Sequence, residues 1–254
     1  MGHHNRHFGG DLHANAGIWS PSTSAANFCE EDYAMTRYIA EFINSLTNLA
    51  YIYLGLRHPQ SQHAPPSPSP IPDLMSASLL LVGVTSFMFH ATLRQTFQLS
   101  DDVSMLLLAA AILQALYCNG QPAARARLTT GAIYACVCAM SAVYVRSGDV
   151  RVHACMFAGL LQLVWPRTLY LVCRREGSDP ARALQLRGFR RAVGTLVFAL
   201  GVWYVDLEWC AELRRLREAV GLPWAWLLEL HGWWHVLTAV GAATYIDLVR
   251  DLCG

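Results

Sequence analysis

Charged residues are scarce in this chain of 254 residues, and lysine is absent altogether. Aspartate, glutamate and arginine make up 15% of the sequence, whereas hydrophobic residues make up 54%. The 19 arginines are scattered among connecting segments, so they form no basic stripe of the kind that binds nucleic acid. With eight tryptophans and a formal net charge of +1, this composition is far from that of a soluble domain and indicates a membrane protein.

The first thirty residues lack the apolar centre and the small-residue cleavage site of a signal peptide. We therefore expect this segment to stay on the protein. Its histidines can bind metal, but a His-rich terminus more often binds nothing in particular. These histidines are His3, His4, His7 and His13. Residues 1–32 are treated as a polar N-terminal segment and residues 33–254 as one transmembrane domain.

Seven apolar windows approach the length needed to cross about 30 Å of hydrocarbon, which takes about 20 helical residues. They are Tyr33–Leu56, Leu74–Ala91, Leu99–Cys118, Leu128–Val145, Val152–Cys173, Ala192–Val205 and Trp226–Val249. The prolines between Arg57 and Asp73 cannot continue a helix and indicate an exposed linker. The predicted fold is all-α: a seven-transmembrane helix bundle in the lipid bilayer.

An odd number of crossings places the termini on opposite sides of the membrane, and counting then assigns each window end to a side. We name the side of the N-terminus face one and the opposite side face two. The polar groups at the window ends all fall on face one. They are Glu30 to Glu41, His90, Asp101, Asp206 with Cys210, and His231 with His235.

Three of these residues, His90, His231 and His235, have the spacing of metal ligands within apolar helices. His231 and His235 are four apart and share one helical face. An ionisable residue within a membrane span costs free energy, so its presence usually indicates a functional site. Three imidazoles can bind one zinc ion and leave its fourth position open for water. The alternative is that each histidine only hydrogen-bonds to a neighbouring helix. The clustering of three favours an intramembrane metal site.

Ser86 lies four residues before His90, so both side chains face the same side of the second window. Asp101 follows a short connection and can return to the site as general base and then as acid for a leaving amine. Ser86 can donate a hydrogen bond to an oxyanion, although serines often bond to their own helix. One of Asp101 and Asp102 is expected to cap the third helix.

A second polar cluster, from Asn27 to Asp32 and then Glu41, gathers the oxygen ligands that calcium prefers. It lacks the pattern of an EF-hand. An acidic helix start would explain Glu30 to Asp32 but not Glu41, which lies deeper in the apolar region. Asp206 has two open interpretations, as a residue that supports the zinc ligands or as an interfacial charge.

The arginine distribution favours face two, with ten arginines against seven, as the cytosolic side. Face one would then be lumenal and oxidising, so Cys29 and Cys210, both near that boundary, could form a disulfide.

Several short motifs together resemble the alkaline ceramidase family. They are Trp19-Ser-Pro-Ser-Thr-Ser, Phe28-Cys-Glu-Glu-Asp-Tyr33, Tyr38-Ile-Ala-Glu-Phe42 with Asn44 and Asn48, Ser86 to Leu93, Gln98-Leu-Ser-Asp101, Asp206 to Cys210 and His231 to His235. The resemblance runs from about Trp19 to Asp247. Adiponectin-receptor-like proteins are distant relatives that share the His and Ser-Asp pattern.

The resemblance implies a seven-helix amidase of the endoplasmic reticulum or Golgi membrane that cleaves ceramide, dihydroceramide or phytoceramide to a sphingoid base and a fatty acid. The scattered arginines exclude a nucleic-acid partner, and no obligate protein partner is expected. The resemblance assigns Zn²⁺ to His90, His231 and His235, catalysis to Asp101 and Ser86, and a disulfide to Cys29 and Cys210. It assigns Ca²⁺ to Asn27, the Phe28 carbonyl, Glu30, Asp32 and Glu41.

Two departures from the family pattern bear on these assignments. The family usually has Asp at Asn27 and Asn at Asp32, which keeps the charge of the calcium site while moving it. It also tends to show Leu-Asp-Glu where this chain has Ser100-Asp101-Asp102, which leaves the catalytic carboxylate in place.

Two other functions follow from the same pattern. The first is a seven-helix receptor or sensor with a structural zinc ion and little hydrolysis. The second is a haem-binding electron carrier, but His231 and His235 share one helical face and cannot bind opposite sides of one haem.

Overall fold

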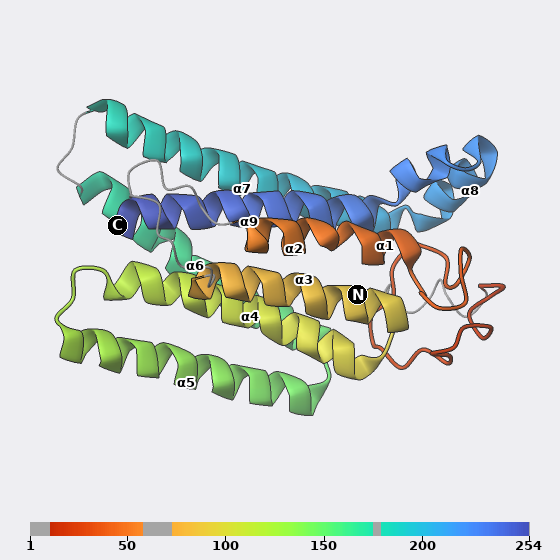
Figure 1. Cartoon of the computed structure of the whole chain (residues 1–254), viewed down its shortest axis with the longest axis horizontal. Coiled ribbons are helices and arrows are strands. Elements are labelled where there is room, and N and C mark those ends of the chain that lie inside the picture. Colours follow the sequence, from red (N-terminus) through yellow and green to blue (C-terminus); the bar gives the residue numbers. More distant parts are fainter. Residues whose placement is uncertain (1–10, 58–72, 175–178, 254) are drawn as a thin grey trace.

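The computed structural model describes residues 11–57, 73–174 and 179–253, and helices form nearly all of their regular secondary structure. His3, His4, His7 and most of the proline-rich linker lie outside these ranges. The helices are α1 (Phe42–Thr47), α2 (Leu49–Leu56), α3 (Leu74–Thr92), α4 (Gln95–Cys118), α5 (Ala123–Ser147), α6 (Val150–Arg174), α7 (Asp179–Glu208), α8 (Cys210–Val220), the 3-10 helix η1 (Trp224–Leu228) and α9 (Leu230–Cys253). Figure 1 shows the long helices running side by side along one axis.

The first apolar window is helical only in its second half, so the expected start at Tyr33 is wrong. The chain from Tyr33 to Glu41 is irregular, and the helix is divided at Asn48 into α1 and α2. The backbone N–H groups of Ala40 and Glu41 donate to the carbonyls of Ala91 and His90, each at 3.0 Å. The last carbonyls of a helix have no partner within that helix, so this extended segment provides hydrogen-bond donors to the carbonyls at the end of α3.

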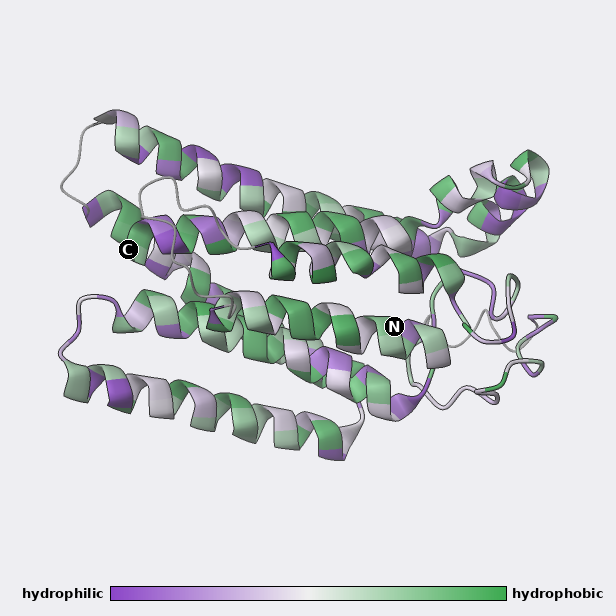
Figure 2. Cartoon of the chain, in the orientation of Figure 1, coloured by the Kyte–Doolittle hydropathy of each residue, from purple (hydrophilic) through white to green (hydrophobic). Residues whose placement is uncertain are grey.

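The sixth window is part of the longest described helix rather than a short one. α7 contains 30 residues and extends the Ala192–Val205 window at both ends. It then bends by 85° into α8, which carries polar and apolar residues on different faces. Figure 2 shows this change, since hydrophilic residues are frequent in α8 and in the irregular N-terminal segment.

Four helices are long and apolar enough to cross a membrane, namely α3, α4, α5 and α6, and the bent pair α7 and α8 is a fifth candidate. α9 contains the polar His231 and His235, and the α1–α2 pair is broken at Asn48, so neither has the composition and length of a simple span. The chain is an all-helical, multi-pass membrane protein.

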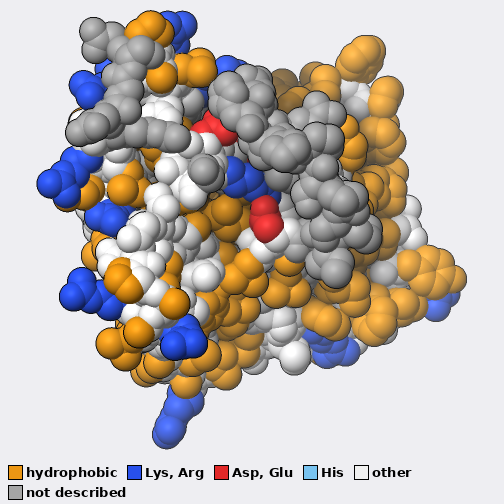
Figure 3. Space-filling model, turned by 60° about the vertical axis from the view of Figure 1, so that its left-hand side comes forward, with side chains coloured by type: hydrophobic (Ala, Val, Ile, Leu, Met, Phe, Trp, Pro, Cys, Tyr) orange, Lys and Arg blue, Asp and Glu red, His pale blue; other side chains and the backbone are white. Residues whose placement is uncertain are grey.

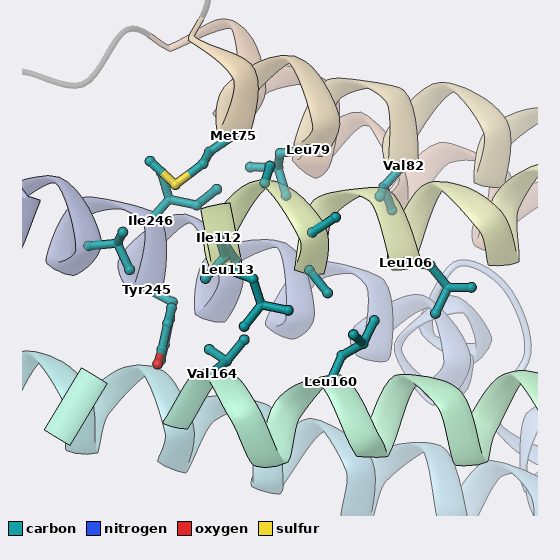
Figure 4. Close-up of a cluster of buried hydrophobic side chains, with 14 of the residues drawn as sticks. Met75, Leu79, Val82, Leu106, Ile112, Leu113, Leu160, Val164, Tyr245 and Ile246 are labelled. Atoms are coloured by element: carbon teal, nitrogen blue, oxygen red, sulfur yellow. The ribbon is translucent and has the colours of Figure 1, made fainter. Parts of the chain in front are cut away.

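The largest core cluster lies between α3, α4, α6 and α9 (Figure 4). Leu79 from α3, Leu106 and Leu113 from α4, Val164 from α6 and Ile246 from α9 are nearly inaccessible to solvent. α4 packs against α3, α6 and α9, and α5 packs on its outer side (Figure 1).

Gly83 on α3 allows α2 to approach closely. A Cβ atom on Gly83 would lie 2.7 Å from the Tyr51 Cβ and 3.0 Å from the Ile52 backbone nitrogen. Small residues let membrane helices pack backbone against backbone in this way.

We predict that Gly83→Ala destabilises the protein by about 1–3 kcal/mol, because α2 and α3 must separate to accept the methyl group. Gly131→Ala on α5 is the matched control, since nothing lies within 4 Å of its added Cβ. Alanine favours helix over glycine by about 1 kcal/mol, so the control should be neutral or slightly stabilising. Melting temperatures in detergent test this, and equal values for the two variants would contradict it.

Candidate metal centre

Three buried histidines converge at the end of the bundle where α3 finishes and α9 begins. One ring nitrogen from each of His90, His231 and His235 lies within 4.8 Å of the other two. The ring centroids are 5.0 Å apart for His90 and His231, 4.7 Å for His90 and His235, and 4.6 Å for His231 and His235. All three side chains are at most 3% exposed. The structure thus brings together the residues that the sequence analysis selected as zinc ligands.

Hydrogen bonds orient two of these rings. The Nδ1 atom of His90 bonds to the Oε2 atom of Glu41, and a carboxylate accepts, so Nδ1 carries the proton. The Nδ1 atom of His235 lies 3.0 Å from the Thr47 hydroxyl, which itself donates to the Ile43 carbonyl at 2.9 Å. That hydroxyl therefore accepts from Nδ1–H. In both rings Nε2 is left with the free electron pair that binds a metal.

This arrangement fits a zinc ion. Zinc bonds to imidazole nitrogen are about 2.0–2.1 Å long, so ligand atoms a few ångströms apart can share one ion. Histidine ligands usually donate their second N–H to a carboxylate, carbonyl or hydroxyl, and Glu41 and Thr47 provide such acceptors. Three protein ligands rather than four are typical of a catalytic site.

Ser86 and Asp101 adjoin the histidines. Ser86 lies one helical turn before His90 on α3 and is 4% exposed. Its hydroxyl lies close enough to the carboxylate of Asp101 on α4 to interact with it. Because α3 and α4 pack against each other, Asp101 is held beside the helix that carries His90.

Asp102 does not cap α4, and neither does Asp101, because the helix begins at Gln95 and its first turn contains no acidic residue. The expected cap is therefore wrong. Asp102 accepts a hydrogen bond from the Tyr144 hydroxyl and lies 3.7 Å from Nδ1 of His153. Two neighbouring aspartates thus point to different helices, Asp101 to α3 and Asp102 to α5 and α6. His153 was not among the functional residues predicted from the sequence, although a histidine within an apolar helix is itself a signal.

Asp206 supports the start of α9. Its side chain is completely buried and accepts hydrogen bonds from the backbone N–H of His231 at 3.2 Å and of Cys29 at 3.3 Å. Complete burial argues against the interpretation as an interfacial charge. Phe28 in the same loop stacks on the His231 ring, with centroids 3.6 Å apart. The N-terminal loop therefore covers the histidine cluster.

The residues predicted to bind calcium lie close together, but N–H groups occupy many of their oxygens. Both Glu30 oxygens accept from α1, at 2.7 Å from the Ile43 nitrogen and 2.8 Å from the Asn44 nitrogen. Both Asp32 oxygens accept from the Asn27 amide. Glu41 bonds to His90 through one oxygen and to the Phe28 N–H through the other, which explains a carboxylate at this depth.

Burial raises the pKa of Glu30 well above its usual value, and the nearby Glu229 and Glu41 raise it further. Burial also raises the pKa of Asp32 to about 8, with contributions from Glu41 and Asp11. Among the described residues, only the three histidines form a group compact enough to bind one ion through their own side chains.

Two arginines of α8 bind this loop, a role that was not predicted from the sequence. Arg217 donates to Glu229 and, at 2.8 Å, to the Cys29 carbonyl. Arg214 donates to Asp11 and, at 3.0 Å, to the same carbonyl. A disulfide joins Cys29 to Cys210, the first residue of α8, with a Cα–Cα distance of 5.3 Å. α8 thus holds the loop over the histidine cluster by hydrogen bonds, ion pairs and a covalent bond.

Comparison with known proteins gives one consistent result. The sequence model described as Ceramidase matches residues 20–252. Alkaline ceramidase YPC1 of Saccharomyces cerevisiae is 31% identical over 93% of this chain and 78% of its own length. Alkaline ceramidase 3 of Mus musculus is 26% identical over 91% of this chain and 84% of its own length. The alkaline ceramidase of Arabidopsis thaliana is 26% identical over 86% of this chain and 80% of its own length. Since the match spans the N-terminal loop, the histidine cluster and every described helix, the chain belongs to the ceramidase family.

Proposed function

We propose that this protein is a zinc-dependent ceramidase that hydrolyses the amide bond of ceramides to a sphingoid base and a free fatty acid. The observation that carries this proposal is the buried cluster of His90, His231 and His235 in a chain of the ceramidase family. When bound there, zinc would lower the pKa of its water towards about 7 and polarise the amide carbonyl.

Asp101 is the proposed general base and then the general acid. Its carboxylate takes a proton from the attacking water and later delivers it to the leaving amine, which must be protonated before the C–N bond breaks. The Ser86 hydroxyl donates a hydrogen bond to the carbonyl oxygen as that atom gains negative charge. The same hydroxyl contacts Asp101 in the structure, so the substrate carbonyl must turn it towards the reacting centre.

The substrate class follows from the setting of the site. The histidines lie at helix ends in a bundle whose outer surface is apolar, so a substrate with two hydrocarbon chains can arrive from the bilayer. Ceramide, dihydroceramide and phytoceramide share the amide bond that the site would cleave. The receptor alternative receives no support from relatives that are named alkaline ceramidases.

We further infer seven crossings, formed by α1 with α2, then α3, α4, α5, α6, α7 and α9. This odd count places the two termini on opposite sides of the membrane, and the arginine distribution favours a lumenal N-terminus and a cytosolic C-terminus. The resemblance to alkaline ceramidases favours the endoplasmic reticulum or Golgi. The Cys29–Cys210 disulfide lies at the histidine end of the bundle and supports an oxidising compartment on that side.

A calcium ion beside the N-terminal loop is a separate proposal, with Asn27, the Phe28 carbonyl, Glu30, Asp32 and Glu41 as ligands. Buried carboxylates favour a nearby cation, and these three acidic side chains are each at most 5% exposed. The ion would replace the N–H donors that now contact Glu30 and Asp32.

We predict that His235→Ala removes stoichiometric zinc and abolishes ceramide hydrolysis, because two imidazoles cannot hold the ion against water. His153→Ala is the matched control for zinc content, since His153 is another buried intramembrane histidine that lies outside the cluster. Metal analysis and product mass spectrometry of the same sample measure both effects. Full zinc and full activity in His235→Ala would contradict the assignment.

Asp101→Asn should retain zinc and lower kcat by about 10²–10⁴-fold, since the amide cannot transfer the proton. Single-turnover hydrolysis of a fluorescent ceramide measures this loss, and metal analysis verifies that zinc is retained. Unchanged turnover would remove Asp101 from the proposed mechanism.

If calcium binds the loop, Ca²⁺ should raise the melting temperature relative to a chelator. The increase should grow as pH rises through about 8, because Asp32 must lose its proton before it can bind the ion. Glu30→Gln should diminish the increase. Glu218→Gln, which removes an exposed carboxylate of α8, should leave it unchanged. Equal increases in the two variants would argue against the site.

A further inference from the structure

A cavity of about 440 Å³ opens at the end of the bundle opposite the histidines. It lies between the end of α4, the start of α5 and the second half of α6. The residues that line it are Tyr117, Gln121, Arg125, Leu128, Thr129 and Arg167. The proposed hydrolysis uses none of them.

Arg167 is held in a defined position in this cavity. Its guanidinium lies 5.0 Å from the centre of the Tyr117 ring and 5.2 Å from that of Tyr170. Its Nε atom donates to the Leu116 carbonyl at 3.3 Å. Aromatic contacts and one backbone hydrogen bond orient the group, and the structure shows no carboxylate in ion-pair contact with it among the residues it describes.

The second arginine, Arg125, is exposed on the first turn of α5 and likewise has no ion pair with a described acidic residue. Several arginines elsewhere do have such pairs. They are Arg151 with Asp149, Arg214 with Asp11, Arg217 with Glu229, and Arg250 with Asp73. The cavity therefore differs from these places in having two cations and no anion.

The sequence explains this imbalance. Residues 103–148, which include the end of α4 and the whole of α5, contain no aspartate or glutamate, and neither does α6. Arg174, one helical turn after Tyr170, adds a third cation, which donates to the Tyr170 hydroxyl at 2.6 Å. Figure 3 brings this end of the molecule forward and shows several arginine side chains on it, many of them along its left and lower edges.

We propose that this cavity binds the phosphate group of an anionic phospholipid. A guanidinium presents paired N–H donors that match phosphate oxygens, and basic pockets between membrane helices are typical binding sites for anionic headgroups. The surroundings favour a lipid over a soluble anion, because the helices that form the cavity expose apolar side chains. Leu128 on α5 is 76% exposed, and Leu163 and Tyr170 on α6 are 52% and 44% exposed. These side chains can contact acyl chains while the phosphate occupies the cavity.

The test uses the full chain, purified and reconstituted in phosphatidylcholine with or without phosphatidic acid. Native mass spectrometry measures retained phosphatidic acid over a titration. The variant Arg125→Gln with Arg167→Gln removes both cavity cations. The matched control, Arg127→Gln with Arg146→Gln, removes two exposed arginines of α5 that do not line the cavity.

Wild-type protein and the control should bind phosphatidic acid equally, and the cavity variant should bind it about 10- to 30-fold more weakly. Arg125→Gln alone should weaken binding about 5-fold without disturbing the stacked Arg167. An equal loss of phosphatidic acid binding in the cavity and control variants would mean that diffuse surface charge attracts the lipid, and it would overturn the proposal. Displacement of the lipid by inorganic phosphate or glycerol phosphate would also overturn it, because the ligand would then be a soluble anion.

Discussion

The hydrogen bond between Glu41 and His90 is the interaction on which the rest of this site depends. One carboxylate oxygen orients the imidazole of α3, and the other accepts the N–H of Phe28, whose ring stacks on His231. The backbone N–H of Glu41 also bonds to the His90 carbonyl. A single buried residue thus connects the N-terminal loop, the end of α3 and the start of α9. Because an unpaired carboxylate at this depth would be costly, each partner constrains the others.

The same end of the bundle contains further polar groups that compensate one another. Asp206 holds the start of α9 against Cys29, and Arg214 and Arg217 of α8 bind the loop that covers the histidines. α8 can do this because α7 bends by 85° where the apolar span ends. The disulfide then fixes the loop to α8. The histidine cluster is therefore enclosed by elements that come from both ends of the sequence.

The two ends of the bundle differ in how their charged side chains are paired. At the histidine end, buried carboxylates contact N–H donors, arginines or histidine. At the other end, the cavity between α4, α5 and α6 has arginines that stack on tyrosines, and no described acid pairs with them. Such a cavity is better suited to an anion from outside the protein than to an internal contact. The protein would thus contact its membrane through the phosphate of a bound lipid as well as through its apolar surface.

Hydropathy and spacing were sufficient to predict helices in every apolar window, and the His-x-x-x-His spacing with His90 was sufficient to select the three histidines that meet. The apolar windows and the histidine spacing are local features of the sequence, and the shared location of the histidines follows from counting membrane crossings. The sequence by itself did not determine that the first window is irregular up to Glu41, that Thr47 and Glu41 orient the imidazoles, or that Asp102 faces Tyr144 instead of capping α4. Only the tertiary structure decided these points, because each depends on a hydrogen bond between segments far apart in the chain, and such partners leave no periodic signal in the sequence.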